Sequence, residues 1–194
     1  MNKTITKEEI NALPLKAFEG EICIPLTDHE IDEAVDYLGN ASILGFDTET
    51  RPNFKKGQHH KVALLQLSTE KRAFLFRINK IGLPDNVKSI LTNSNIMKAG
   101  AAIHDDIKAL RQISDFTPNG FTDIQAIAHE LGIEHSGLKP LTALLLDFKL
   151  SKAQQTSNWE NQYLSKAQQL YAATDAWVSL KIYNRLMEIK KNPE

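Results

Sequence analysis

Two acidic residues, Asp47 and Glu49, stand two positions apart in the segment FDTE, at the end of an apolar run that begins at Ile43. Side chains two apart on a strand point to the same face of its sheet. Two carboxylates placed in this way repel each other unless a cation lies between them, and their oxygens are ligands suited to Mg²⁺ or Mn²⁺. An Asp-x-Glu pair is common, and by itself it more often marks a strand end with solvated acids. The burial expected for this strand favours metal binding, because unpaired buried carboxylates are unstable.

A tyrosine and an aspartate, Tyr171 and Asp175, lie four positions apart in the segment YAATDAW. On a helix this spacing places both on one face, one turn apart, so that a single pocket can receive both. Taken alone, the pair is more typical of a tyrosine half inside the core and an aspartate on the surface. The two alanines between them leave that face uncluttered.

A third candidate acid, Asp106, begins a predicted helix after the segment AGAAIHD. The carboxyl end of a strand is where open α/β sheets place functional groups, although the helix dipole alone explains an acid in a first turn. His104 and Asp105 are adjacent competitors, and the residue types alone do not choose among the three. Asp123 is instead expected to cap the helix that follows it.

Basic residues gather in two stretches that could contact a phosphate backbone. They are a loop between the first two core strands with Lys55, Lys56, His59, His60 and Lys61, and a smaller cluster of Lys149 and Lys152. Exposed lysines are equally often only solubilising, and a histidine pair in a loop without further ligands is usually just surface. Trp159 is expected to be a packing residue rather than a platform for base stacking.

The segments that must position these residues alternate between strand and helix patterns. Strands are predicted at 43–48, 62–68 and 73–78, then at 96–101 and near Phe121, and EICIP at 21–25 is a further candidate. Helices are predicted around 87–91, from about 106 to 113, and over 125–131. Three successive strands followed by alternating strands and helices indicate an α/β fold, a mixed sheet covered by helices.

Three pairs with capping-box spacing mark helix starts. They are Thr6 with Glu9, Thr27 with Glu30, and Ser165 with Gln168. After Thr27 the apolar residues recur at helical spacing up to Gly39. The last helix runs from Ser165 to about Ile189, with a stripe expected to face the core. This stripe consists of Leu170, Trp177, Leu180 and Met187.

Length and composition limit the remaining possibilities. The chain has 194 residues, a net charge of −1 and one cysteine, Cys23. A single cysteine excludes an intrachain disulfide and a cysteine-based zinc cluster. The N-terminus has no apolar stretch typical of a signal peptide, and no apolar run is long enough to span a bilayer, so we expect a cytoplasmic protein without membrane association. The near-neutral charge is compatible with a nucleic-acid substrate without arguing for one, and the sequence identifies no protein partner or oligomeric state.

Together, the motifs resemble a known family. The segments FDTE, KVALLQLS, AGAAIHDDIKAL, SNW and LSKAQQLYAATDAW are similar to those of the DEDDy 3′-5′ exonucleases of the DnaQ-like, ribonuclease-H-like superfamily. The similarity is strongest to the ribonuclease D type and to the exonuclease domain of the Werner syndrome protein. It covers about residues 41–190, and three ordered motifs are far more specific than any one of them.

The resemblance implies a ribonuclease-H-like fold with a mixed five-stranded sheet flanked by helices. Residues 41–194 would form the exonuclease domain, and residues 1–40 an N-terminal extension packed on it. The first family motif falls on Asp47 and Glu49. The second motif, Asp-x-x-x-Leu, matches Asp106 and Leu110. The resemblance therefore selects Asp106 rather than Asp105. The third, Tyr-x-x-x-Asp, is supplied by Tyr171 and Asp175.

The activity implied is also that of the family. The four acids would hold two divalent ions, Mg²⁺ or Mn²⁺, and Tyr171 would help position the attacking water. The substrate would be DNA or RNA with a free 3′ end, and the products 5′-mononucleotides. Trp159, Leu164 and Gln168 also fall on family positions, whereas Tyr163 stands where the family often has proline. A chain ending directly after the last helix would be a stand-alone nuclease.

Two alternatives of other classes use the same fold. A catalytically inactive nucleic-acid-binding module should have lost one or more of the acids, and this sequence keeps all four and the tyrosine. A related endonuclease or other phosphoryl-transfer enzyme is disfavoured by the Tyr-x-x-x-Asp element, which belongs to the exonuclease branch.

Overall fold

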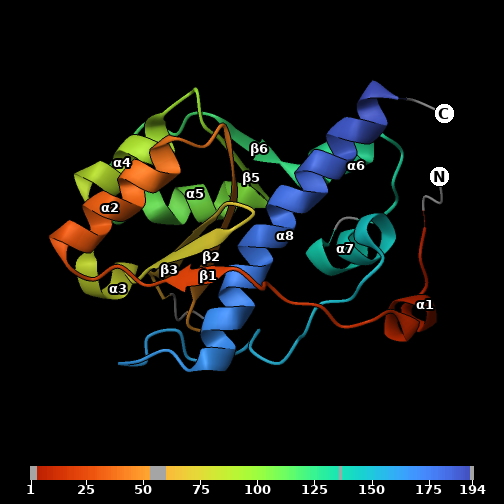
Figure 1. Cartoon of the computed structure of the whole chain (residues 1–194), viewed down its shortest axis with the longest axis horizontal. Helices are drawn as coiled ribbons and strands as arrows, with labels where there is room; N and C mark the ends of the chain where they lie inside the picture. The colour runs from red at the N-terminus through yellow and green to blue at the C-terminus, as the bar shows by residue number, and fades with distance from the viewer. Residues whose placement is uncertain (1–3, 53–59, 136, 193–194) are drawn as a thin grey trace.

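A mixed sheet with helices on both faces forms the centre of the protein (Figure 1). The computed structural model describes residues 4–52, 60–135 and 137–192. The elements in chain order are α1 (Lys7–Ala12), β1 (Glu21–Cys23), α2 (Asp28–Gly39), β2 (Ile43–Thr50), β3 (Val62–Ser68), β4 (Arg72–Phe76), α3 (Ile78–Ile81), α4 (Asp85–Thr92), β5 (Met97–Gly100), α5 (Ile103–Arg111), β6 (Phe121–Asp123), α6 (Ile124–Glu130), α7 (Leu138–Leu146) and α8 (Lys166–Lys191). Within the described ranges, no helix has the length and hydrophobicity needed to cross a bilayer.

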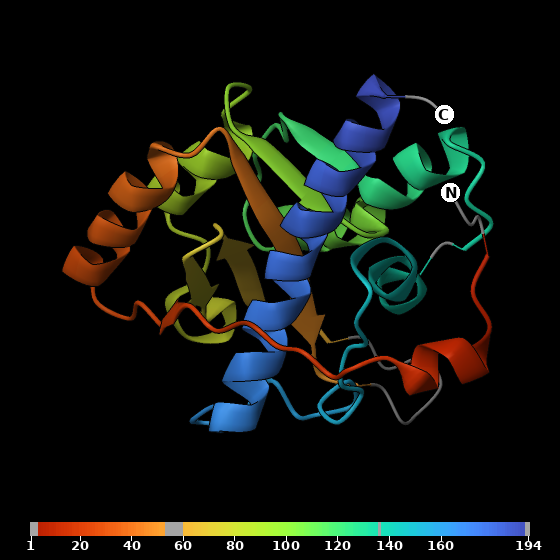
Figure 2. The same ribbon diagram turned by 45° about the vertical axis from the view of Figure 1, so that its right-hand side comes forward.

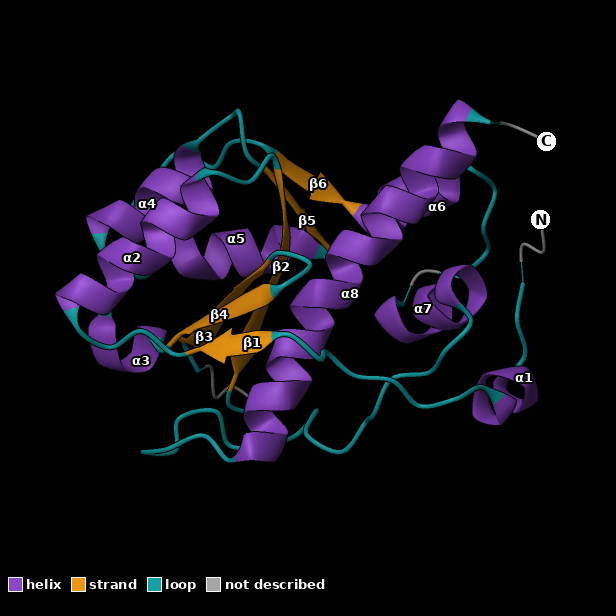
Figure 3. Ribbon diagram, viewed as in Figure 1, coloured by secondary structure: helices purple, strands orange, loops and turns teal. Residues whose placement is uncertain are grey.

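The strand order is β1-β4-β3-β2-β5-β6 (Figure 3). β3 pairs antiparallel with β2 and β4, and the pairs β1–β4, β2–β5 and β5–β6 are parallel. The predicted α/β fold with a mixed sheet flanked by helices is confirmed, but the sheet has six strands rather than five. The additional strand is the short candidate at 21–25. It pairs with the edge of β4, and three residues are too few for an alternating pattern to distinguish a strand.

The two faces of the sheet bury different helices. Leu44 and Phe46 of β2, with Leu65 and Leu67 of β3, belong to a core cluster that also contains the buried residues of α2, α4 and α5. The opposite face is crossed by α8, which runs across the front of the sheet in Figure 2. α6 and α7 share a second core cluster with α8. The long C-terminal helix therefore lies directly over the strand that carries the FDTE motif.

The segment between α1 and β1 crosses α8 on its outer side, as the red chain in front of the blue helix shows (Figure 1). The backbone N–H of Phe18 donates to the Thr174 hydroxyl at 3.0 Å. Leu15 forms an isolated parallel bridge with Lys149. This segment is thereby fixed to the helix that faces the sheet.

Local start signals in the sequence are confirmed. All three predicted capping boxes are present, with reciprocal hydrogen bonds between the N-cap side chain and the residue three positions later. The side chain of Asp123 accepts from the backbone N–H of Gln125 and caps α6 as expected.

Two further expectations are wrong, and one helix has no counterpart among the predicted elements. α5 begins at Ile103 rather than near Asp106, because Ala102 adopts a left-handed conformation (φ 55°) that starts the helix earlier. The sequence patterns predict no helix at α7, which has apolar residues on most sides and therefore no polar face. Leu170 does not face the core and is 39% exposed, since the segment around Leu15 meets that side of α8 only loosely.

Candidate active site

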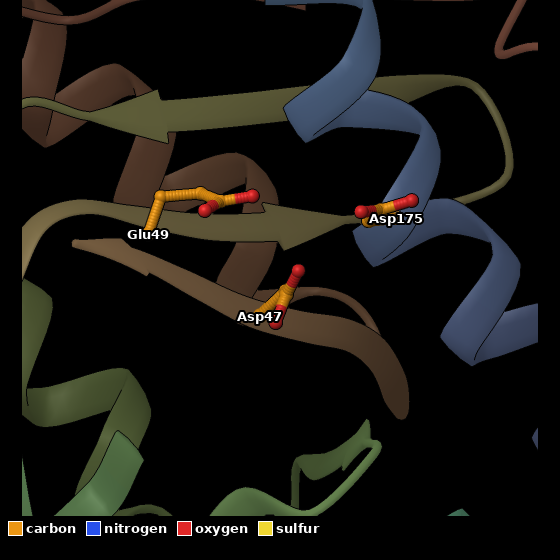
Figure 4. Close-up of side chains that lie close together, drawn as sticks. All are labelled: Asp47, Glu49 and Asp175. Atoms are coloured by element: carbon orange, nitrogen blue, oxygen red, sulfur yellow. The ribbon is translucent and has the colours of Figure 1, made fainter. Parts of the chain in front are cut away.

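β2 and α8 bring three acidic side chains together (Figure 4). Asp47 and Glu49 share a face of β2, as their spacing predicts, and Asp175 projects from α8 toward them. One carboxylate oxygen from each of the three lies within 4.8 Å of the others. Asp47 and Glu49 are partly buried and Asp175 is buried. Two segments of sequence separated by more than a hundred residues thus supply one acidic cluster.

The cluster depends on a close approach between helix and strand. A Cβ atom on Gly45 would lie 1.8 Å from the carbonyl oxygen of Ala176, so β2 and α8 can touch only because this residue is glycine. Ala172, Ala173 and Ala176 are fully buried on the helix side. Small residues at this crossing bring Asp175 within reach of Asp47.

The acids of the cluster resist ionisation in the absence of a cation. Burial, followed by the charges of Asp175, Glu49 and Asp106, raises the pKa of Asp47 well above its usual range. Burial and the charges of Asp175 and Asp106 raise the pKa of Glu49 to about 9. Burial raises the pKa of Asp175 to about 7, against the opposing effects of Tyr171 and Lys139. A divalent cation would relieve this repulsion, and an all-oxygen donor set fits Mg²⁺ or Mn²⁺.

Asp106 lies beside this cluster rather than within it. The hydroxyl of Thr48, on β2 between the two clustered acids, donates a hydrogen bond to the Asp106 carboxylate. Burial raises the pKa of Asp106, and the bond from Thr48 opposes that rise. The two competitors, His104 and Asp105, are exposed. The structure therefore places Asp106, the family-motif residue, next to the acids of β2.

Tyr171 stands one turn before Asp175 and faces the same site. Its ring packs against Trp159 with 6.1 Å between centroids. Burial, then the charges of Asp175 and Glu49, raises the pKa of the phenol above its usual value. The hydroxyl is therefore protonated at neutral pH and available as a hydrogen-bond donor.

The start of α8 is fixed to the loop before it. Ser165 and Gln168 cap the helix, and the Gln168 side-chain amide also donates to the carbonyl of Asn158 at 3.2 Å. Trp159 is fully buried, which confirms its expected packing role. This loop and helix together hold the Tyr171 ring in place.

The basic residues predicted to contact substrate are only partly described. Lys55, Lys56 and His59 lie outside the described residues. His60 lies with its Nδ1 atom 3.5 Å from a carboxylate oxygen of Glu160.

The other predicted cations stand at the surface. Lys61 and Lys152 are exposed, and the Lys149 ammonium group donates to the carbonyl of Asn11. Lys139 is a further residue of this region, not predicted from the sequence, and its charge acts on both Asp175 and Glu49. No motif signals it, because its position depends on how α7 packs on α8.

Comparison with known proteins identifies the family. A sequence profile described as 3′-5′ exonuclease matches residues 22–190. The chain belongs to the 3′-5′ exonuclease family. The match covers the elements from β1 to α8, apart from Glu21 at the start of β1 and Lys191 at the end of α8, and includes all four acids and Tyr171.

Individual relatives agree with this membership. The chain is 35% identical over 155 residues to the mouse bifunctional 3′-5′ exonuclease/ATP-dependent helicase WRN, covering 77% of this chain and 11% of that protein. It is 34% identical to a putative 3′-5′ exonuclease of Acanthamoeba polyphaga mimivirus, covering 77% of this chain and 41% of the viral protein. The chain thus spans less than half the length of these two relatives.

Solved structures share the fold. The exonuclease domain of Aedes aegypti Nibbler superposes with a TM-score of 0.81 at 21% identity, covering 94% of both chains. Escherichia coli RNase D superposes with a TM-score of 0.79 at 22% identity, covering 89% of this chain and 45% of that one. The predicted ribonuclease-H-like exonuclease fold is confirmed.

Proposed function

We propose that this chain is a metal-dependent 3′-5′ exonuclease that hydrolyses phosphodiester bonds at the 3′ ends of nucleic acids and releases 5′-mononucleotides. The observation that carries the proposal is the gathering of the Asp47, Glu49 and Asp175 carboxylates within 4.8 Å, in a member of the exonuclease family. Such a cluster would be unstable as a purely structural feature, because each acid raises the pKa of its neighbours.

The acids would hold two divalent ions. Asp47, Glu49 and Asp175 would bind one, and Asp47 and Asp106 the other. When bound, such ions lower the pKa of a water molecule and stabilise the charge on the phosphate and on the leaving oxygen. In the reaction water adds to phosphorus, the bond from phosphorus to the 3′-oxygen breaks, and the shortened strand keeps a 3′-hydroxyl group.

Tyr171 would orient the nucleophile. Its hydroxyl is protonated at neutral pH, lies on the same helix face as Asp175, and can donate or accept one hydrogen bond at the reacting water. Packing on Trp159 fixes the direction of the phenol ring. Because the hydroxyl is held in a fixed direction, less entropy is lost when the water is aligned with the phosphorus.

Substrate binding would use exposed cations around the acidic cluster. Lys152 and Lys61 are exposed, and His60 adds a partly buried imidazole beside Glu160. Lys55, Lys56 and His59 are proposed from the sequence alone. A structure of Trypanosoma brucei RNase D that shares this fold holds RNA, which makes RNA one of the two substrates to compare.

The test is digestion of matched single-stranded RNA, single-stranded DNA and recessed duplexes that carry a 5′ label, with Mg²⁺ or Mn²⁺. A ladder that shortens from the 3′ end and releases 5′-mononucleotides is expected, and Asp47→Asn should abolish it. Binding without cleavage would instead identify an inactive nucleic-acid-binding module. Internal cuts would identify an endonuclease.

A further inference from the structure

Lys139 approaches the acidic cluster from a third element. It lies in the first turn of α7, and its Nζ atom is 6.0 Å from the centroid of the Tyr171 ring. The same atom donates to the side-chain carbonyl of Gln155 at 3.0 Å. Lys139 is half-buried, so its ammonium group is fixed at the edge of the site rather than free in solvent.

The ammonium group lies in the field of two of the clustered acids. Burial lowers the pKa of Lys139, the charge of Asp175 raises it, Lys152 lowers it, and Glu49 raises it. A nearby opposite charge favours the charged form of a cation. Among the ion pairs of the described residues, none joins Lys139 to either acid. The ammonium group therefore lies near the cluster, over the Tyr171 ring, without a direct ion pair to it.

The anion that belongs in this space is a phosphate group. A phosphodiester beside the cations that Asp47, Glu49 and Asp175 would bind, and in reach of the Tyr171 hydroxyl, would lie between those groups and Lys139. The non-bridging oxygens of the phosphate gain negative charge as water attacks the phosphorus. A fixed cation beside these oxygens therefore stabilises the transition state more than the ground state. The charge of Lys152 also lowers the pKa of Lys139, and two lysines near each other are favourable beside an anion.

We propose that Lys139 is a catalytic residue that contacts a non-bridging oxygen of the scissile phosphate. This inference rests on the proposed function. Lys139 exchanges no proton in the step, because its role is to hold charge. The competing role is structural, in which the ammonium group only packs over the Tyr171 ring and holds the Gln155 loop.

Two substrates separate a contact with the scissile phosphate from a contact with the rest of the strand. One is a single-stranded oligonucleotide, and the other is the p-nitrophenyl ester of thymidine 5′-monophosphate, which contains one phosphate only. Lys139→Met keeps the length of the side chain and its helix propensity, and Lys139→Arg keeps the charge. Lys108→Met is the control, because Lys108 is an exposed lysine on α5.

Lys139→Met is expected to lower kcat/KM about 10- to 100-fold on both substrates, the range for loss of one hydrogen bond to a charged group. Lys139→Arg should recover part of that loss, and Lys108→Met should stay within about two-fold of the wild type. In the absence of substrate, the increase in Tm on adding Mn²⁺ should be no smaller for Lys139→Met than for the wild type.

Three results would overturn the inference while leaving the proposed function intact. The first is cleavage by Lys139→Met at the wild-type rate, and the second is a loss of its activity on the oligonucleotide alone. The third is a smaller Mn²⁺-dependent increase in the Tm of Lys139→Met, which would assign Lys139 to the structure of the metal site. A wild-type protein that cleaves neither substrate would remove the proposed function and this inference with it.

Discussion

The hydroxyl of Thr48 donates a hydrogen bond to the carboxylate of Asp106, and this bond joins β2 to α5 beside the three clustered acids. The bond opposes the rise in the pKa of Asp106 that burial causes. Thr48 thereby favours the charged form of the one acid that lies outside the cluster. A charged and oriented Asp106 is the form that could bind a cation.

Thr48→Val should therefore weaken cation binding at Asp106 without disturbing the other acids. We expect a loss of about 10-fold in activity at limiting Mg²⁺, and a higher Mg²⁺ concentration at half-maximal rate. Thr48→Ser restores the hydroxyl and should recover most of the activity. An unchanged Mg²⁺ midpoint in Thr48→Val would show that the bond has no part in metal binding.

The metal-free protein should lose stability as pH rises. The folded-state pKa values of Glu49 and Asp175, about 9 and about 7, lie above those of the unfolded chain. The unfolded chain therefore releases these protons first, so the stability present below about pH 4 is lost progressively as pH rises from there to the folded-state values. Between pH 7 and pH 9, where Glu49 still holds its proton in the folded state, the free energy of unfolding should fall by on the order of 2 kcal/mol.

Thermal unfolding in EDTA and in Mn²⁺ at several pH values measures this effect. Mn²⁺ should flatten the pH dependence, because the ions replace the protons as partners of the carboxylates. Asp175→Asn removes one of the titrating groups and should flatten it in EDTA as well. If the unfolding temperature of the wild type in EDTA depends on pH no more than that of Asp175→Asn, the acids are not coupled as described.

Tyr171→Phe should slow cleavage while leaving metal binding unchanged. The phenylalanine ring keeps the packing against Trp159 and removes only the hydroxyl. A fall of about 10-fold in kcat is expected, in the range for one positioned hydrogen bond. The raised pKa of Tyr171 also means that the wild-type pH–rate profile should show no tyrosine ionisation below about pH 10. A variant as fast as the wild type would reduce Tyr171 to a packing residue.

Gly45→Ala should disrupt the crossing of β2 and α8. The added methyl group would lie 1.8 Å from the carbonyl oxygen of Ala176, a backbone atom that cannot rotate away. We expect the free energy of unfolding to fall by about 2–4 kcal/mol and Mn²⁺ binding to weaken, because Asp175 moves away from Asp47. Gly39→Ala is the matched control. A Cβ atom there meets nothing within 4 Å, so stability should be unchanged or slightly higher. Equal stability of the two variants would contradict this account of the crossing.

Features that depend on residues close together in the sequence could be predicted from it. The capping pairs that begin α1, α2 and α8 are each contained within four residues, and all three are present. The spacings of Asp47 with Glu49 and of Tyr171 with Asp175 likewise fix which side chains share a face. That these two pairs meet depends on the crossing at Gly45, which no local pattern shows. The family resemblance supplied that step.

Features that depend on tertiary packing could not be predicted from local sequence patterns. Lys139 reaches the site only because α7 packs on α8, and α7 itself lacks the alternating polar face that predicts a helix. Gln66 lies directly across from Asp47 in the β2–β3 pair, and its fully buried amide has no hydrogen-bond partner among the described residues. All of β3 is buried, so no pattern of exposure distinguishes its polar residue beforehand.

The central claim is that Asp47, Glu49 and Asp175 bind divalent cations together. A crystal grown with Mn²⁺ and a nucleoside 5′-monophosphate, with diffraction measured near the manganese absorption edge, tests it most directly. The account predicts anomalous density between these three carboxylates and further density toward Asp106, with the phosphate alongside. Density for the phosphate with no anomalous signal among these oxygens would contradict it.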